Sequence, residues 1–353
     1  MVRLGAITEN YKSFQRLAGP AAVAGVVKAD AYGMGAEFVG PALAAAGCDT
    51  FFVARLEEGL ALRRALGAGP RIFVLDGAPS DAVPALIAHQ LTPVLNSLAQ
   101  IAGWSAAAAA SHCALDAAIH IDTGMNRLGL PGEELGLLAA ESKIRLKALN
   151  PVLLMSHLAC GDEVDNKMND MQLSRFRSAL AMLPPAPASL AASGGSFLGQ
   201  PYWFDLVRAG IGLYGGAPQI GGKPLKTVAV LTARVLQLRR IDKGDGVGYA
   251  ATFRAKEPTM IATVALGYAG GIPRALSNKG SAFAAGKCVN FAGRVSMDMT
   301  TVDVSGLELK AGDSVEFLGD RMMLEEAAAL ADTNAYEILT RLRVPRHYTD
   351  AAS

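Results

Sequence analysis

The chain has 353 residues, of which 51% are hydrophobic and 18% are charged. This length exceeds one average domain and supplies enough apolar surface for a large core, which excludes a disordered chain and predicts two globular domains. Thirty-three Lys and Arg against 32 Asp and Glu leave a net charge of +1, so the composition offers no attraction for nucleic acid or an anionic membrane. A small molecule is therefore the expected partner.

The start of the chain and its cysteines indicate a cytoplasmic protein without a metal site. "MVRLGAITEN" lacks the apolar core of a signal peptide, and no run of about 18 uncharged apolar residues predicts a membrane span. The four cysteines form no C-x-x-C pair, which argues against structural zinc and fits reduced thiols. We expect a cytoplasmic location and no metal.

Eight short runs rich in Val, Ile, Leu and Ala begin at residue 22, and longer segments separate them. The runs are nearly continuous, as parallel strands covered on both faces are. The segments between them, such as 56–69 and 169–183, repeat apolar residues every three or four positions, as the outer helices of a barrel do. The pattern predicts an α/β fold with an N-terminal (β/α)8 TIM-type barrel. The runs are 22–29, 50–54, 71–77, 91–96, 115–124, 151–159, 188–193 and 205–215.

A Gly- and Pro-rich stretch at 216–224 separates this pattern from a second one. The chain then continues as strand-like pieces joined by turns, with one late helix at 324–333. We therefore predict a barrel domain over 1–225 and a C-terminal, mainly β domain over 226–353. The strand-like pieces are 228–241, 246–255, 259–269 and 281–295.

Lys28 follows the apolar run 25–27, where a predicted strand ends and a glycine-containing turn begins. The carboxyl ends of barrel strands carry the active sites of such folds. A lysine close to a protein interior loses hydration, so its pKa falls and its neutral amine can attack a carbonyl carbon. A lone lysine at a strand end more commonly just extends its charge into solvent. Lys28 alone therefore does not establish a site.

The stretch around Lys28, "VVKADAYGMG", resembles the pyridoxal-phosphate site of bacterial alanine racemases, whose lysine holds the cofactor as a Schiff base. Seven further stretches resemble the same family in order along both predicted domains. The resemblance implies an isomerase that interconverts L- and D-alanine and supplies D-alanine for cell-wall peptidoglycan. The seven are "IDTGMNRLG", "MSHLA", "VRAGIGLYG", "GVGYAATF", "LGYAGGIPR", "RVSMDMT" and "LRVPR".

A racemase removes a proton from one face of a carbon and returns a proton to the other, so two proton carriers are needed. The resemblance assigns these roles to Lys28 and to Tyr249 of "GVGYAATF". In the family this tyrosine reaches the barrel of the partner subunit, which implies a homodimer. An ordinary strand aromatic is the alternative interpretation of Tyr249.

Arg208 of "VRAGIG" matches the family arginine that faces the pyridine nitrogen. Arginine stays protonated, so it donates a hydrogen bond while discouraging a proton on the ring nitrogen. The cofactor ring then withdraws electrons from the substrate less strongly, which limits decarboxylation and transamination. His157 of "MSHLA" matches a histidine packed beside the ring and this arginine, although a lone histidine at a strand end is also common in protein cores.

The resemblance points to Tyr32, Ser193 and the backbone of Gly210 and Ile211 for the phosphate. The fold prediction agrees, because the loops after strands seven and eight of such barrels commonly bind phosphate through backbone N–H groups.

Two further residues match substrate-binding positions of the family. Arg127 of "DTGMNRLG" matches the residue that orients the substrate carboxylate, a role suited to a two-pronged donor. Met297 of "SMDMT", with Asp298 beside it, matches a residue that touches substrate from the partner chain, although core filling is the usual role of methionine.

The sequence departs from the family at three places. Where many members have a carbamylated lysine, seven residues before the carboxylate-orienting arginine, this chain has His120. A histidine supplies no fixed negative charge, so we expect Arg127 to be held by an anion or by water. Gly270 replaces a common aspartate near the entrance, and Leu342 stands where some members carry a phosphate-contacting tyrosine.

Three alternatives remain open on the sequence. A racemase of wider range acting on serine as well as alanine differs only in pocket volume, because an apolar pocket rejects an added hydroxyl weakly. Decarboxylases of similar architecture pair the ring nitrogen with a carboxylate, so Arg208 argues against them. Barrels that only carry pyridoxal phosphate lack the β domain that this chain retains.

Overall fold

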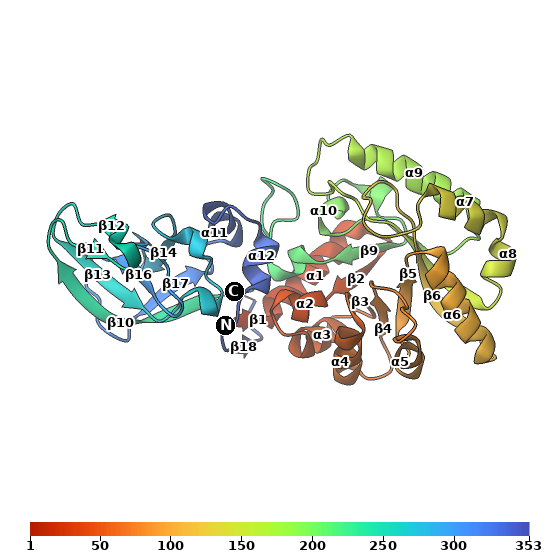
Figure 1. The fold of residues 1–353 in the computed structure, drawn as a ribbon, viewed down its shortest axis with the longest axis horizontal. Helices are drawn as coiled ribbons and strands as arrows, with labels where there is room; N and C mark the ends of the chain where they lie inside the picture. The colour runs from red at the N-terminus through yellow and green to blue at the C-terminus, as the bar shows by residue number, and fades with distance from the viewer. Residues whose placement is uncertain (353) are drawn as a thin grey trace.

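In the computed structural model, which describes residues 1–352, the N-terminal part forms an eight-stranded parallel barrel surrounded by helices (Figure 1). The predicted fold class is confirmed, and each of the eight apolar runs overlaps a barrel strand. The hydrogen-bonded order is β8-β7-β6-β5-β4-β3-β2-β9, and a bridge between Ala192 and Arg208 joins the two ends. The strands are β2 (Ala22–Val26), β3 (Thr50–Val53), β4 (Arg71–Val74), β5 (Thr92–Leu95), β6 (Leu115–His120), β7 (Leu149–Met155), β8 (Ala188–Ser189) and β9 (Leu206–Ala209).

Helices cover the outside of the barrel, and their ends follow from the local sequence. In α4 the side chain of Glu58 accepts a hydrogen bond from the Arg55 N–H, and the helix ends at Gly67, whose φ of 71° favours glycine. Ser97 caps α6, which contains the alanine run. The helices are α1 (Leu4–Ala18), α3 (Ala36–Ala45), α4 (Leu56–Leu66), α5 (Val83–Ala88), α6 (Leu98–Ala110), α7 (Gly132–Ala140), α8 (Ser142–Arg145), α9 (Met168–Met182) and α10 (Ser193–Ser196).

The segment that carries Lys28, α2 (Lys28–Tyr32), is not an ordinary helix. Its residues 29–32 have φ between 52° and 55°, the left-handed region, although none of them is glycine. A left-handed conformation costs an L-residue about 1–2 kcal/mol, so surrounding contacts must hold this turn in place. Such strain is typical of functional sites.

The C-terminal part is mainly β, as predicted. An antiparallel six-stranded sheet has the order β15-β14-β17-β10-β13-β16, and a hairpin of β11 (Gly246–Val247) and β12 (Phe253–Arg254) lies beside it. The expected pieces correspond to β10 to β15, whereas β16 and β17 come from segments without a specific prediction. The strands are β10 (Leu231–Ile241), β13 (Thr259–Val264), β14 (Ser281–Ala284), β15 (Lys287–Asn290), β16 (Thr300–Asp303) and β17 (Ser314–Leu318).

Two late helices form instead of the single one expected, because α11 (Leu324–Leu330) is followed by α12 (Ala335–Thr340), which Asn334 caps. In Figure 1, α12 lies at the junction between the sheet and the barrel. The N-terminal strand β1 (Val2–Arg3) pairs with β18 (Tyr348–Thr349) near the C-terminus. The division of the chain at residue 225 stays a prediction.

Candidate active site

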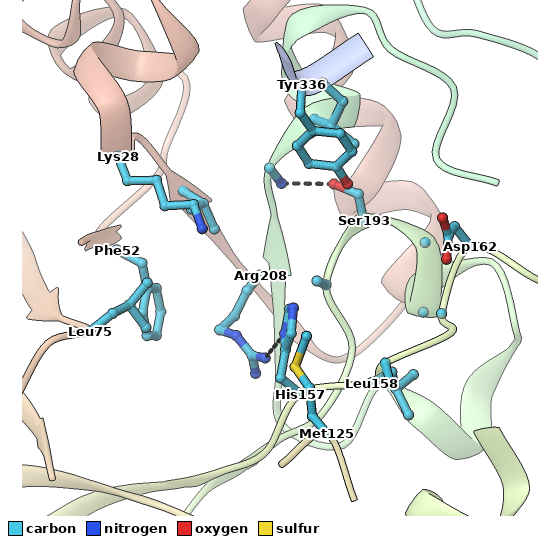
Figure 2. Close-up of a pocket in the computed structure, with 18 of the residues that line it drawn as sticks. Lys28, Phe52, Leu75, Met125, His157, Leu158, Asp162, Ser193, Arg208 and Tyr336 are labelled. Atoms are coloured by element: carbon cyan, nitrogen blue, oxygen red, sulfur yellow. Dashed lines mark hydrogen bonds between the residues drawn. The ribbon is translucent and has the colours of Figure 1, made fainter. Parts of the chain in front are cut away.

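A cavity of about 530 Å³ opens at the carboxyl ends of the barrel strands (Figure 2). This volume lies within the range of small-molecule sites. Most of the predicted site residues line this one cavity, although they are far apart in the sequence. The predicted residues that line it are Lys28, Tyr32, Arg127, His157, Ser193, Arg208, Gly210 and Ile211, and His120 lines it as well.

Lys28 lies directly after β2, at the start of the left-handed turn, and its side chain extends into the cavity (Figure 2). Burial lowers the pKa of its ammonium group, and the charge of Arg127 lowers it further, whereas the carboxylate of Glu58 opposes the shift. Glu58 also accepts a hydrogen bond of 2.7 Å from the N–H of Ala29. The same carboxylate therefore stabilises the turn and raises the pKa of the Lys28 amine.

Arg208 lies on β9 and is 3% exposed. Its Nη1 donates to Ser189, and its Nη2 donates to the carbonyl of Ser156 at 2.7 Å and to Nδ1 of His157 at 3.2 Å (Figure 2). Since these bonds come from the two Nη atoms, Nε is the donor that a ligand can use. Burial lowers the pKa of Arg208 to about 10, so the guanidinium is charged at neutral pH.

His157 is neutral and has one tautomer. Its Nδ1 faces a guanidinium, which can only donate, so Nδ1 accepts and the ring proton is on Nε2. Desolvation lowers the pKa of His157 well below its usual 6.5, and the charge of Arg208 acts in the same direction.

Ser193 and two glycines form the opposite end of the cavity. The Ser193 hydroxyl accepts from the N–H groups of Gly210 at 2.8 Å and Gly212 at 3.3 Å, so it joins the loop after β8 to the loop after β9. A Cβ at Gly210 would lie 2.6 Å from Oη of Tyr32, which shows that the close approach requires glycine. Ile211 begins a 3-10 helix, so its N–H has no partner within that helix.

Arg127 and His120 lie at the end of the cavity formed by β6. Arg127 is exposed on the loop 121–130, and none of the ion pairs among residues 1–352 involves it. His120 is the last residue of β6, and its Nδ1 lies 2.7 Å from Oδ1 of Asn96. Burial and the charge of Arg208 lower the pKa of His120 to about 4.

Tyr249 and Met297 do not line the cavity of their own chain among the residues described. Tyr249 belongs to a 3-10 turn, Tyr249–Ala251, between β11 and β12, and is 73% exposed, whereas Met297 is 55% exposed. Both side chains are thus presented on the surface of the β part. This placement differs from the alternative interpretation of Tyr249 as a strand aromatic.

Sequence reasoning missed Tyr336, a residue of α12 that lines the cavity near Ser193 (Figure 2). Desolvation raises the pKa of its phenol to about 12, so it is a hydrogen-bond donor at neutral pH. Leu342, at the position where some members of the family carry a tyrosine, is 9% exposed and belongs to the hydrophobic core. The capping residue Asn334 was the available signal that a further helix begins here.

The cavity fits an anionic cofactor and an anionic substrate. Three basic side chains, Lys28, Arg127 and Arg208, line it, whereas Asp162 is the single carboxylate among its described lining residues. A phosphate at the Ser193 end and a carboxylate at the Arg127 end would balance this charge. Pyridoxal phosphate, an aldehyde with a phosphate group, therefore suits the residues present.

Both parts of the chain are similar to proteins of one known family. Residues 2–218 match the family described as "Alanine racemase, N-terminal domain", and residues 228–348 match "Alanine racemase, C-terminal domain". A catabolic alanine racemase of Agrobacterium fabrum is 47% identical over 345 residues, which cover 97% of this chain and 89% of the relative. An alanine racemase of Rhodospirillum rubrum is also 47% identical, over 354 residues that cover 98% of this chain and 94% of the relative.

Solved structures show the same fold. The alanine racemase of Bartonella henselae with covalently bound pyridoxal phosphate has a TM-score of 0.95 and 40% identity, over 99% of this chain and 98% of that one. The biosynthetic alanine racemase of Pseudomonas aeruginosa has a TM-score of 0.91 and 35% identity, over 99% and 98%. The match in both halves of the sequence and over the whole fold establishes that this chain belongs to the alanine racemase family.

Proposed function

We propose that this protein interconverts L-alanine and D-alanine with pyridoxal phosphate, Lys28 and Tyr249 exchanging protons on opposite faces of the substrate. The observation that carries the proposal is the convergence of Lys28, Arg127 and Arg208 on one cavity at the carboxyl ends of the barrel strands. The relatives' names and the family's dependence on pyridoxal phosphate support it.

Lys28 is the residue proposed to hold the cofactor, through its neutral amine. Burial favours this form, because it lowers the pKa of the ammonium group. Ser193, Tyr32 and the backbone of Gly210 and Ile211 are proposed to hold the phosphate. Tyr336, close to Ser193 in the same cavity, can donate a further hydrogen bond there.

When bound, pyridoxal phosphate withdraws electrons from the α carbon of the amino acid and makes its proton acidic enough to leave. The chain then supplies two proton carriers. Nζ of Lys28 takes or returns the proton on one face, and Oη of Tyr249 from a second copy of the chain does so on the other. The high exposure of Tyr249, outside the cavity of its own chain, supports this role.

Arg208 is proposed to limit the reaction to proton exchange. Its guanidinium stays charged, so its Nε–H would donate a hydrogen bond to the ring nitrogen of the bound cofactor without passing it a proton. Neutral His157, which accepts from Nη2, keeps the guanidinium in place. Arg127 is proposed to bind the substrate carboxylate, and Met297 to contact the substrate from a second copy of the chain.

A homodimer, a division of the chain at residue 225 and a cytoplasmic location complete the proposal. The surface position of Tyr249 and Met297 supports the dimer. The four cysteines, none of which is in a disulfide among the residues described, support a reducing compartment. No helix among residues 1–352 has the length and apolar character needed to cross a membrane.

The proposed role in peptidoglycan supply is consistent with the family, although the relative from Agrobacterium fabrum is named a catabolic enzyme. A racemase with a wider substrate range is not favoured, since the similar proteins are named for alanine. A comparison of the turnover rates of L-alanine and L-serine measures the substrate range directly.

The decisive experiment is incubation with L-alanine in heavy water. The wild-type protein is expected to introduce deuterium at the α carbon while optical rotation falls to zero. Lys28→Ala should remove the visible absorbance of the lysine-bound cofactor and nearly all activity, because no other amine replaces Nζ. Lys147→Ala, at an exposed lysine, is the control and should keep both. Unchanged absorbance in Lys28→Ala would refute the assignment of the anchor.

A further inference from the structure

The amide of Asn96 has only one possible orientation. Its Nδ2 lies 2.9 Å from the carbonyl oxygens of Leu75 and of Val94, which can only accept hydrogen bonds. Both amide protons are therefore used, and the rotated amide would place an oxygen against two carbonyls. Gln100 fixes the backbone as well, because its Oε1 accepts from the N–H of Asn96 at 2.8 Å.

This orientation determines the tautomer of His120. The atom of Asn96 that faces Nδ1 of His120, at 2.7 Å, is Oδ1, an acceptor. Nδ1 must therefore carry the proton and donate it. Burial lowers the pKa of His120 to about 4, so the ring is neutral at pH 7 and its Nε2 has a free lone pair.

The other edge of the imidazole faces the loop that carries Arg127. A Cβ at Gly129 would lie 3.2 Å from Cδ2 of His120, the carbon bonded to Nε2. This loop is held against β6, since the N–H of Leu130 donates to the carbonyl of His120 at 2.8 Å. His120 and Arg127 also line the same cavity.

The nearest acidic side chain in the sequence is engaged elsewhere. Asp122 accepts hydrogen bonds from the N–H groups of Gly124 and Asn126, so it shapes the loop. Asp162 lies on the Ser193 side of the cavity (Figure 2). At the β6 end, His120 is thus an acceptor without a competing carboxylate.

We propose that Asn96 and His120 form a neutral positioning pair, in which Asn96 fixes the tautomer and Nε2 of His120 accepts a hydrogen bond from the guanidinium of Arg127. This inference rests on the proposed function, because it explains how Arg127 is oriented toward the substrate carboxylate. In this pair the acceptor for Arg127 is Nε2 of His120 rather than a halide, and Nε2 has no proton to donate to an anion.

The tautomer is tested by NMR on the holoenzyme labelled with ¹⁵N-histidine. The chain has five histidines, and the signals of residue 120 are identified by their loss in His120→Gln. We expect Nδ1 protonated and Nε2 unprotonated from pH 6 to 8. A signal pattern of the Nε2–H tautomer or of an imidazolium would overturn the proposal.

The positioning role is tested by kinetics. His120→Ala and Asn96→Ala are expected to raise the KM for L-alanine about tenfold, the effect of losing one hydrogen bond to a charged group, with a smaller change in kcat. His120→Gln, which can still present an oxygen acceptor, should raise the KM less than His120→Ala does. His112→Asn is the matched control, because His112 is exposed and has a φ of 53° that asparagine tolerates.

The outcomes separate this inference from the proposed function. If the wild type racemises alanine but the KM of His120→Ala is unchanged, or if KM depends on chloride or bromide at constant ionic strength, the positioning pair is wrong and the racemase stands. If the wild type does not racemise alanine, the proposed function is wrong, and the NMR measurement still decides the tautomer.

Discussion

The charges around the cavity are arranged so that its two histidines are neutral. His157 faces Arg208 through Nδ1, and the charge of Arg208 also lowers the pKa of His120. A neutral histidine can accept a hydrogen bond from a guanidinium, which a charged one cannot. Two arginines can therefore stay charged in the site without carboxylate partners. This arrangement leaves their positive charge for the anionic ligands.

The lowered pKa of His120 predicts how stability depends on pH. The folded pKa is about 4 against 6.5 for an ordinary histidine, so the unfolded chain takes up a proton first as the pH falls. The stabilisation is complete above pH 6.5 and declines as the pH falls toward 4, by at most about 3 kcal/mol.

The melting temperature of the holoenzyme and of His120→Gln at pH 7.5 and at pH 5 checks this prediction. The melting temperature of the wild type is expected to fall more than that of the variant between pH 7.5 and pH 5, because glutamine does not titrate. An equal loss in both proteins would show that His120 makes no contribution.

At the scale of elements, four side chains join neighbouring barrel strands in pairs at their carboxyl ends. Each belongs to the helix that follows one strand of the pair, and each bonds to backbone or side-chain atoms beyond the other strand. Glu58 of α4 joins β2 to β3, Gln100 of α6 joins β4 to β5, Gln172 of α9 joins β6 to β7, and Ser193 of α10 joins β8 to β9.

Gln172 is the most buried of the four, at 0% exposure. Its Oε1 accepts from the N–H of Ala159, and its Nε2 donates to the carbonyl of His157 and to Thr123 Oγ1. It thus fixes the two segments that carry His157 and Arg127.

Gln172→Leu is expected to lower stability by about 2–4 kcal/mol, because it leaves buried polar groups without partners. Activity should also fall, since the segments of His157 and Arg127 lose a common support. Thermal unfolding and steady-state kinetics measure both effects. Gln237→Leu, at an exposed position on β10, should change stability by less than about 0.5 kcal/mol. Similar losses in both variants would contradict the role of Gln172.

The left-handed turn after Lys28 leads to a second prediction at the scale of elements. Ala29 is exposed and has a φ of 52°, which glycine adopts without strain. Ala29→Gly is therefore expected to be neutral or stabilising by up to about 1 kcal/mol. Ala106→Gly, at an exposed position inside α6, should instead cost about 1 kcal/mol. Thermal unfolding of the two variants compares them, and an equal cost would argue against a left-handed turn.

At the scale of the whole molecule, the proposed site needs two copies of the chain. Lys28 lines the barrel cavity, whereas Tyr249 is exposed on the β part of the same chain. If the two act together across a dimer, two inactive variants can complement each other. The association of the copies is then part of the catalytic apparatus.

Co-expression of Lys28→Ala and Tyr249→Phe is expected to restore activity to about a quarter of the sites. Half of the dimers are then mixed, and each mixed dimer has one site with both native residues. Each variant expressed alone provides the background rate. Racemisation that does not exceed this background would show that Lys28 and Tyr249 do not meet across an interface.

The sequence by itself determined the strands of the barrel, the order of the two parts and the family. The reason is local: apolar runs of strand length, helical spacing and short motifs are properties of neighbouring residues. The predicted residues with side chains on barrel strands or on the loops directly after them, such as Lys28 and Arg208, share one cavity for the same reason, since the ends of parallel strands meet at one edge.

The tertiary structure alone decided the contacts between segments far apart in the chain. Tyr336 enters the cavity because α12 packs at the junction of the two parts, and Asn96 determines the proton of His120 because β5 and β6 are neighbours. The left-handed turn persists because contacts such as the hydrogen bond from Ala29 to Glu58 offset its strain. No local pattern encodes these features, because each depends on the positions that the folded barrel gives to residues separated in sequence.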